Sequence, residues 1–247
     1  MLRYVDQFLG FKCAGDVIGI VGPMKGLSKE ISEAMAIVRR VKPVVIQEPK
    51  KFTLVDLCSG NALVPVITAF MLPTAHNYAI DLRERNGRRW TEVRNFTYLN
   101  RDIYSQDILN TIRSIPGPII LTSVHPCKGL AERVVDIYNN CDNIEMLYLM
   151  PCCVGKVPIN ISDKIESQMN RDNLWGLYLA LKADGRLTQD TNVISPKNRL
   201  VLADKHGYTD ASTKEGPEGR ICSPAEGRES EESIPARREL ASDSEFR

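Results

Sequence analysis

The sequence predicts an α/β fold with a doubly wound, mostly parallel sheet of about seven strands and helices on both faces. Two observations predict it. Five short apolar segments between residues 52 and 150 alternate with segments of helical periodicity, and polar residues lie at or near their carboxyl ends. Apolar strands of this kind are typical of a parallel sheet that is covered on both sides. Because such sheets bind ligands outside the carboxyl ends of their strands, we look for functional residues there.

The strand and helix segments follow one another along the chain. The five predicted strands are 52–57, 78–81, 96–100, 118–124 and 144–150. The helices predicted after the first four strands are 62–72, 84–93, 106–115 and 128–140. A helix over 162–182 and two late strands, 192–193 and 199–203, complete the sheet, with a turn over 195–198 between these strands.

Three regions of the chain differ in composition. Residues 1–50 are predicted to form a helical cover, because apolar residues recur at helical spacing between 26 and 42. The main α/β domain is expected over 51–206. Residues 207–247 contain almost no large apolar side chains, so they cannot bury enough surface to offset the entropy of ordering. We therefore expect a disordered acidic tail there.

Charge and cysteine content restrict the classes of partner. The net charge of the whole chain is +1, but residues 1–208 alone carry a net charge of +5, which the acidic residues after them offset. A mildly basic body is compatible with a polyanionic substrate without requiring one. The seven cysteines include no Cys-x-x-Cys pair, which indicates reduced thiols and a cytoplasmic protein. No apolar run is long enough to span a bilayer, so we expect no membrane partner.

The first candidate motif follows the first predicted strand and opens a helix. It contains Asp56, Cys58, Ser59, Gly60 and Asn61. A glycine here lets the backbone approach a ligand, and the helix amino terminus behind it offers free N–H groups. Only one glycine is present, so the dinucleotide pattern G-x-G-x-x-G is not met.

Two further candidates follow the second and third strands. Asp81 comes 21 positions after Gly60, a spacing that suits an acceptor for ribose hydroxyls, and Leu82 and Arg83 come directly after it. Asp102 and Ile103 follow the third strand and could border a purine ring. The alternative for both aspartates is a structural one, as helix caps or solvated loop carboxylates.

Together these residues resemble the cofactor-binding signature of class I, Rossmann-like S-adenosylmethionine-dependent methyltransferases. The resemblance covers about residues 50–150. It implies that the turn from Asp56 to Gly60 holds the methionine end of the cofactor, with Asp56 near its amino group. It further implies that Asp81 holds the ribose and that Asp102 and Ile103 hold the adenine. The chain departs from the family at position 62, where alanine stands in place of a second glycine.

The loop after the fourth strand supplies the catalytic candidate. His125 could act as a base or position a nucleophile at neutral pH, or it could only cap the following helix. The Asn/Asp-Pro-Pro-Tyr loop of amino-group methyltransferases is absent, as are the Lys and Glu spacings of a Lys-Asp-Lys-Glu ribose methyltransferase. His125 is therefore the one catalytic residue that we predict.

Cys127 after the fourth strand and the Cys152–Cys153 pair after the fifth could meet at adjacent strand ends. Their spacing matches no recognised zinc pattern, so we predict no metal and leave open whether these cysteines bind one. The combination is similar to a methyltransferase subgroup that includes a tRNA ribose 2′-O-methyltransferase, although Val154 stands where that subgroup has histidine. The acceptor thus stays unknown, RNA or a small molecule, with a lean to RNA.

Other functions stay open. A methyltransferase-like binding or scaffold protein without turnover is one alternative, because no further catalytic motif is visible. A nicotinamide-dependent oxidoreductase is disfavoured by the single-glycine turn. Arg83, Arg85, Arg88, Arg89 and Arg94 surround Trp90 and could grip phosphates, but we interpret this segment as a solvated helix face. The sequence says nothing of the oligomeric state.

Overall fold

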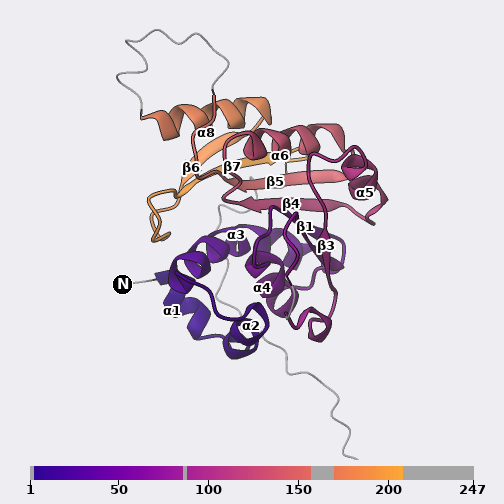
Figure 1. The fold of residues 1–247 in the computed structure, drawn as a ribbon, viewed down its shortest axis with the longest axis vertical. Helices are drawn as coiled ribbons and strands as arrows, with labels where there is room; N and C mark the ends of the chain where they lie inside the picture. Colours follow the sequence, from indigo (N-terminus) through magenta and orange to yellow (C-terminus); the bar gives the residue numbers. More distant parts are fainter. Residues whose placement is uncertain (1–2, 86–87, 157–169, 208–247) are drawn as a thin grey trace, which may run out of the picture.

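The computed structural model describes residues 3–85, 88–156 and 170–207 (Figure 1). These residues form a seven-stranded sheet in the order β3-β2-β1-β4-β5-β7-β6. The strands are β1 (Thr53–Leu57), β2 (His76–Asp81), β3 (Phe96–Asn100), β4 (Ile119–Val124), β5 (Ile144–Met150), β6 (Arg186–Gln189) and β7 (Arg199–Asp204). The first five strands pair in parallel, and β7 is antiparallel to both of its neighbours. The predicted mostly parallel sheet is confirmed.

Helices cover both faces of this sheet, also as predicted. The described helices are α1 (Arg3–Leu9), α2 (Ala14–Val21), α3 (Leu27–Gln47), α4 (Leu63–Met71), α5 (Ile108–Ser114), α6 (Gly129–Asn140) and α8 (Arg171–Lys182), with a 3₁₀ turn η1 (Trp90–Glu92). Helices α1 to α4 lie on one side of the sheet, and α5, α6 and α8 lie on the other (Figure 1). None of the described helices is both long and apolar enough to cross a membrane.

Each face of the sheet contributes to its own hydrophobic core. Side chains alternate along a strand, so Leu54 of β1 faces the core beneath α1 to α4 while Val55 faces the core beneath α5, α6 and α8. Ile120 and Leu121 of β4 divide in the same way. All four side chains are fully buried. The sheet is therefore a central layer, and only its edges and strand ends remain for a binding site.

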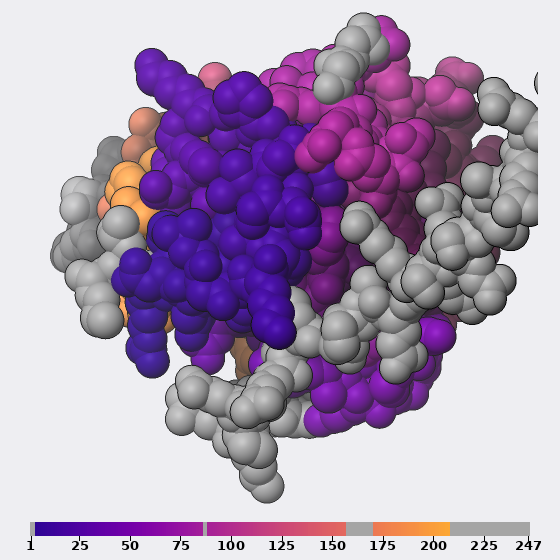
Figure 2. Space-filling model, turned by 90° about the horizontal axis from the view of Figure 1, so that it is seen from below, coloured from indigo at the N-terminus to yellow at the C-terminus, as the bar shows by residue number. Residues whose placement is uncertain are grey.

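The amino-terminal helices form much of the molecular face that Figure 2 shows, with residues 3–47 in indigo. Two of these helices, α1 and α3, also contact the segment between β6 and β7. The Tyr4 hydroxyl of α1 donates a 2.7 Å hydrogen bond to Asp190 Oδ2, and Arg40 Nη1 of α3 lies 2.8 Å from the same oxygen. Asp190 lies between β6 and β7, so the amino-terminal layer is tied to the carboxyl-terminal hairpin.

The prediction of a charged helix over 84–93 is wrong. Among the described residues of this segment only the short turn η1 is helical. The Trp90 ring stacks on Tyr98 of β3, with centroids 5.3 Å apart and planes 4° apart, and also contacts Phe96. These contacts hold the segment against the sheet edge, and they override its helical propensity. Residues 86–87 lie outside the described part of the chain.

The strand expected at 192–193 is also wrong. Asp190 accepts a hydrogen bond from the Asn192 backbone N–H at 3.0 Å, which makes a tight turn, and Val193 is buried because it packs into the core. The sixth strand is β6, which the sequence analysis missed, as it missed α2. The predicted helix over 162–182 is described from Arg171 onward. Its first part, 162–169, and the predicted tail from 208 lie outside the described residues.

Candidate functional site

The carboxyl ends of β1 and β2 lie side by side, in parallel register from Thr53 and His76 onward. The turn after β1 and Asp81, the acidic residue that ends β2, are joined there. The backbone N–H of Gly60 donates a 2.8 Å hydrogen bond to Asp81 Oδ2, and the N–H of Ser59 donates to the Ile80 carbonyl at 3.2 Å. Two positions that the sequence places 21 residues apart thus form one unit.

The backbone of the turn after β1 is folded into an unusual conformation. Cys58, Gly60 and Ala62 all have positive φ, at 56°, 56° and 58°. Such values are strained for residues with a side chain, and strain of this kind clusters at functional sites. Ala62 keeps the left-handed conformation at the position where a second glycine would be expected.

Asp81 lies at the centre of this unit and is 5% exposed. Besides Gly60, the backbone N–H and the Nε of Arg83 donate to Asp81 Oδ1 at 2.9 and 3.0 Å. Burial acts to raise the pKa of Asp81, but the hydrogen bonds from Arg83 and Gly60 outweigh it, so the pKa lies below its ordinary value. Asp81 is therefore an ionised acceptor. The Arg83 side chain is 64% exposed, so it can move aside for another donor.

Asp56 lies beneath the turn. Its carboxylate is 2% exposed and accepts hydrogen bonds from Ser59 Oγ at 2.5 Å and from Thr122 Oγ1 of β4 at 2.7 Å. Burial raises the pKa of Asp56 to about 7, and the two hydroxyl groups offset this only in part. In this conformation Asp56 fixes Ser59 and the ends of β1 and β4, and it does not face open space.

Asn61 connects the turn to the amino-terminal layer. Its Nδ2 donates to Glu30 Oε2 of α3 at 3.5 Å, and its Oδ1 accepts from Arg88 Nη2 at 3.5 Å. Arg88 also lies against Gly22, where an added Cβ would be 1.8 Å from Arg88 Nη1. Residues that the sequence analysis assigned to a helical cover thus border the glycine turn.

The loop after β3 presents different residues from those predicted. The Asp102 carboxylate accepts from the Tyr104 backbone N–H at 2.9 Å, and the Ile103 side chain is buried in the core. The exposed apolar side chains at these strand ends are Leu82, which was predicted, and Tyr104, which was missed; they are 66% and 55% exposed. An added Cβ on Gly129 would lie 3.1 Å from the Tyr104 hydroxyl, so Tyr104 reaches the start of α6. An aromatic residue directly after Asp102-Ile103 was the available signal.

His125 lies after β4 with a φ of 60°, and its ring faces α3. The Nε2 atom is 2.6 Å from Glu33 Oε1, an ion-pair distance, although the angles are not those of a hydrogen bond. Glu33 is 1% exposed, and Lys29 Nζ lies 3.5 Å from the same oxygen. Both ring nitrogens of His125 are shielded from solvent. The sequence analysis missed Glu33, whose signal is a carboxylate within the apolar stripe of α3.

Three thiols meet beside this loop. Cys127 Sγ lies 3.0 Å from Cys152 Sγ, which lies 3.5 Å from Cys153 Sγ. Burial raises the pKa of both Cys127 and Cys152. Hydrogen bonds from these two thiols lower the pKa of Cys153. The meeting of the three cysteines at adjacent strand ends was foreseen from their positions.

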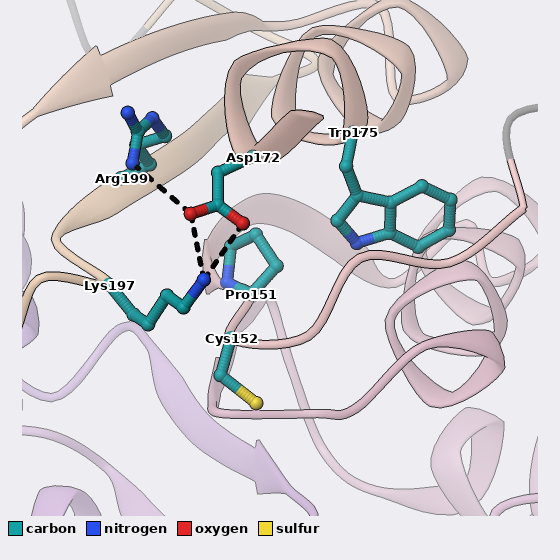
Figure 3. Close-up of a pocket in the computed structure, with 6 residues that line it drawn as sticks. All are labelled: Pro151, Cys152, Asp172, Trp175, Lys197 and Arg199. Atoms are coloured by element: carbon teal, nitrogen blue, oxygen red, sulfur yellow. Dashed lines mark hydrogen bonds and ion pairs between the residues drawn. The ribbon is translucent and has the colours of Figure 1, made fainter. Parts of the chain in front are cut away.

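A small, partly open hollow lies next to Cys152 (Figure 3). Its lining residues are Pro151, Cys152, Asp172, Trp175, Lys197 and Arg199. Lys197 Nζ lies 2.8 and 2.7 Å from the two carboxylate oxygens of Asp172, and Arg199 Nη1 lies 3.9 Å from Oδ2. Two cations thus share one carboxylate. The sequence analysis assigned this segment to a turn and a late strand, and so missed its basic side chains as a group.

Known proteins resemble this chain in sequence pattern and in fold. A family model described as a methyltransferase domain matches residues 28–158. No curated protein sequence matches the chain. The structure of the 23S rRNA methyltransferase ErmE aligns at 12% identity with a TM-score of 0.41, over 68% of this chain and 65% of that one.

Two further solved structures align in the same way. A cyclopropane-fatty-acyl-phospholipid synthase-like protein from Lactobacillus casei ATCC 334 aligns at 12% identity with a TM-score of 0.43, over 77% of this chain and 80% of that one. An O-methyltransferase family protein from Burkholderia thailandensis aligns at 10% identity with a TM-score of 0.36, over 81% and 69%. Likenesses this distant say nothing about which molecule this chain acts on.

Proposed function

The chain belongs to the methyltransferase-domain family, and from this premise we propose that it transfers a methyl group from S-adenosylmethionine to an acceptor. The observation that carries the proposal is the hydrogen bond between Gly60 N and Asp81 Oδ2 at 2.8 Å. It couples a strained turn at the end of β1 to an ionised carboxylate at the end of β2. This is where a sheet of this topology binds a ligand.

The residues at these strand ends fit a cofactor that has an amino acid end, a ribose and a purine. Asp81 would accept from the ribose hydroxyls once the exposed Arg83 side chain moves away. Leu82 and Tyr104 offer exposed apolar surface for the purine, and Asp102 lies on the same loop as Tyr104, whose backbone N–H donates to its carboxylate. The turn at 58–61 would hold the amino acid end, with Asp56 keeping Ser59 in place from below.

S-adenosylmethionine supplies a methyl group that is electrophilic because it is bonded to a sulfonium. The protein then has to hold a nucleophile in line with that methyl, and positioning alone can account for a large share of the rate. Both His125 nitrogens are shielded in this conformation, so we assign His125 a positioning role: its contact with Glu33 anchors the loop after β4 to α3. Its predicted role as a base requires the ring to turn outward.

We propose that the acceptor binds beside the loops after β4 and β5, with RNA as the first candidate class and a small molecule as the second. Lys197 and Arg199 line the hollow there with a single carboxylate between them, which suits an anionic acceptor. The net charge of +5 over residues 1–208 agrees with this. We also propose a cytoplasmic location, because the six described cysteines are free thiols.

The first test is calorimetric titration of the full chain with S-adenosylhomocysteine, for the wild type and the Asp81→Asn variant. We expect the variant to bind at least about tenfold more weakly, a loss of about 1.4 kcal/mol, because the amide has one acceptor oxygen instead of two. Asp136→Asn is the matched control, since this carboxylate lies on α6 and pairs only with Lys182 in the described structure. Equal affinity in all three proteins would refute the ribose assignment.

The second test concerns turnover. Labelled S-adenosylmethionine is incubated with the protein and with total RNA or a pool of small molecules, before and after ribonuclease treatment. Label that becomes ribonuclease-sensitive supports the RNA proposal, and label in the small-molecule pool supports the second candidate. Cofactor binding without label in any fraction would favour the methyltransferase-like scaffold instead.

A further inference from the structure

Three cysteines from two separate loops converge at the carboxyl edge of the sheet. Cys127 follows β4, and Cys152 and Cys153 follow β5. These strands are neighbours in parallel register, with Val124 opposite Met150, so the residues that come next leave the sheet at the same place. All three Sγ atoms lie within 4.8 Å of one another. The proposed cofactor residues do not include these cysteines.

The spacing of the sulfur atoms suits a shared metal ion better than a disulfide. A tetrahedral zinc ion with bonds of about 2.3 Å holds its sulfur ligands about 3.8 Å apart. The observed separations of 3.0 Å, 3.5 Å and at most 4.8 Å lie on both sides of that value. A disulfide needs about 2.05 Å, so each pair would have to approach by about 1 Å or more.

The surroundings of the thiols also select the ion. The His125 carbonyl accepts from both the Cys127 and the Cys152 thiol, at 3.7 and 3.5 Å, so the two sulfur atoms lie beside the same backbone group. Lys128 and Lys197 act on Cys153 with positive charge, which partly balances thiolates. The cluster contains no carboxylate, so the hard ions Ca²⁺ and Mg²⁺ are poor candidates, and thiolates favour zinc. Cys127 is exposed, which leaves a path for the ion.

We propose that Cys127, Cys152 and Cys153 bind one zinc ion as thiolates. Binding transfers the three thiol protons to solvent and forms three zinc–sulfur bonds, with no change of oxidation state. Three protein ligands leave the fourth tetrahedral position for water or another ligand. The ion would tie the loop after β4 to the loop after β5. This inference does not depend on methyl transfer.

Cobalt(II) is the probe, because it takes the zinc site and its thiolate complexes are coloured. The full chain is stripped of metal under reducing conditions and titrated with cobalt and then with zinc. We expect about one equivalent of cobalt per chain, with thiolate-to-metal absorption and the visible bands of a tetrahedral ion, both removed by zinc.

The Cys127→Ser and Cys153→Ser variants should each bind cobalt at least about tenfold more weakly, since even changes outside the ligand set cost that much. Cys141→Ala removes a buried thiol at the end of α6 and should leave the titration unchanged. Circular dichroism shows whether each variant is folded. Because there are two ligand variants, the proposal can still be tested if one of them does not fold. A wild type without thiolate–cobalt absorption overturns the proposal. So does absorption that persists in both ligand variants, or a Cys127–Cys152 disulfide in a chain that binds no cobalt after reduction.

Discussion

At the scale of single residues, the candidate site is held by buried polar contacts that sequence spacing indicates only in part. The spacing of Gly60 and Asp81 was enough to predict their proximity, because parallel strands end at the same edge. Sequence alone could not show that Arg83 donates hydrogen bonds to the Asp81 carboxylate or that the Ile103 side chain faces the core. Glu33 was missed for a physical reason: its partner, His125, is 92 positions away on another element.

The burial of Asp56 predicts an unusual dependence of stability on pH. Its pKa rises from 3.8 in the unfolded chain to about 7 in the folded one. Between these values the folded state holds a proton that the unfolded state has lost, so this residue makes the free energy of unfolding fall as pH rises. The total is on the order of 4 kcal/mol, at about 1.4 kcal/mol per unit.

The Asp56→Asn variant checks this, because it cannot ionise. Urea unfolding of both proteins from pH 4 to 8 should show the wild type losing stability relative to the variant as the pH rises through that window. A constant difference across the window would mean that Asp56 is ionised in the fold at every pH tested.

The contact between His125 and Glu33 predicts a large loss of stability for the His125→Phe variant, which keeps a ring but removes both nitrogens. Glu33 would be left buried without its closest partner, and breaking a buried pair in this way costs roughly 3–5 kcal/mol. Lys29 is the other neighbour of Glu33, and its side chain is 50% exposed. Lys29→Ala should therefore cost less than about 1 kcal/mol of stability. Chemical denaturation compares the two. Equal small losses would leave His125 free for the catalytic role predicted from the sequence.

At the scale of elements, hydrophobic pattern was a good guide where strands lie within the sheet and a poor one at its margins. The limits of β5 agree with the sequence prediction and those of β4 differ from it by one residue, since buried apolar runs leave few alternatives. The short strand Arg186–Gln189 is polar and lies at the sheet edge, so it has no such run. The segment around Trp90 has helical charge spacing, yet its ring stacks on β3, and tertiary contact overrode propensity.

Two glycines, one within α2 and one just after it, allow a matched test of where glycine is required. Gly22, just after the helix, has φ 68° and ψ −177°, a conformation nearly restricted to glycine, and an added Cβ would meet Arg88. Gly22→Ala should therefore lower the free energy of unfolding by about 1–3 kcal/mol. Gly15, within the helix, has open space around it, and Gly15→Ala should be neutral or stabilise by up to about 1 kcal/mol. Thermal unfolding of both variants distinguishes the two positions, and similar shifts would show that the strain at Gly22 is not real.

At the scale of the whole molecule, the amino-terminal helices share one hydrophobic core with the sheet and α4. The sequence predicted a helical cover over residues 1–50 and a separate start of the main domain at 51. It could not show that the cover is tied to the far hairpin, because the link consists of side chains more than 100 positions apart. Tyr4 and Arg40 both bind Asp190 at the turn between β6 and β7.

This link predicts that the chain unfolds as one unit and that Asp190→Ala destabilises all of it. Asp190 is 5% exposed, and its pKa is lowered because hydrogen bonds from Tyr4 and Arg40 outweigh the effect of burial. Removing it leaves a partly buried cation unpaired, so we expect a loss of roughly 3 kcal/mol or more. The control Asp136→Ala breaks a more exposed pair and should cost less than about 1 kcal/mol.

Two probes report on different parts of the molecule during urea unfolding. Both tryptophans, Trp90 and Trp175, lie outside the amino-terminal layer, whereas far-ultraviolet circular dichroism includes α1 to α3. If the layer and the sheet form one cooperative unit, the two transitions coincide in the wild type and shift together in Asp190→Ala. If circular dichroism instead changes first, and only that early step moves in the variant, residues 1–50 fold as a domain of their own. The turn at 58–61 would then lose the contact between Asn61 and α3 before the sheet unfolds.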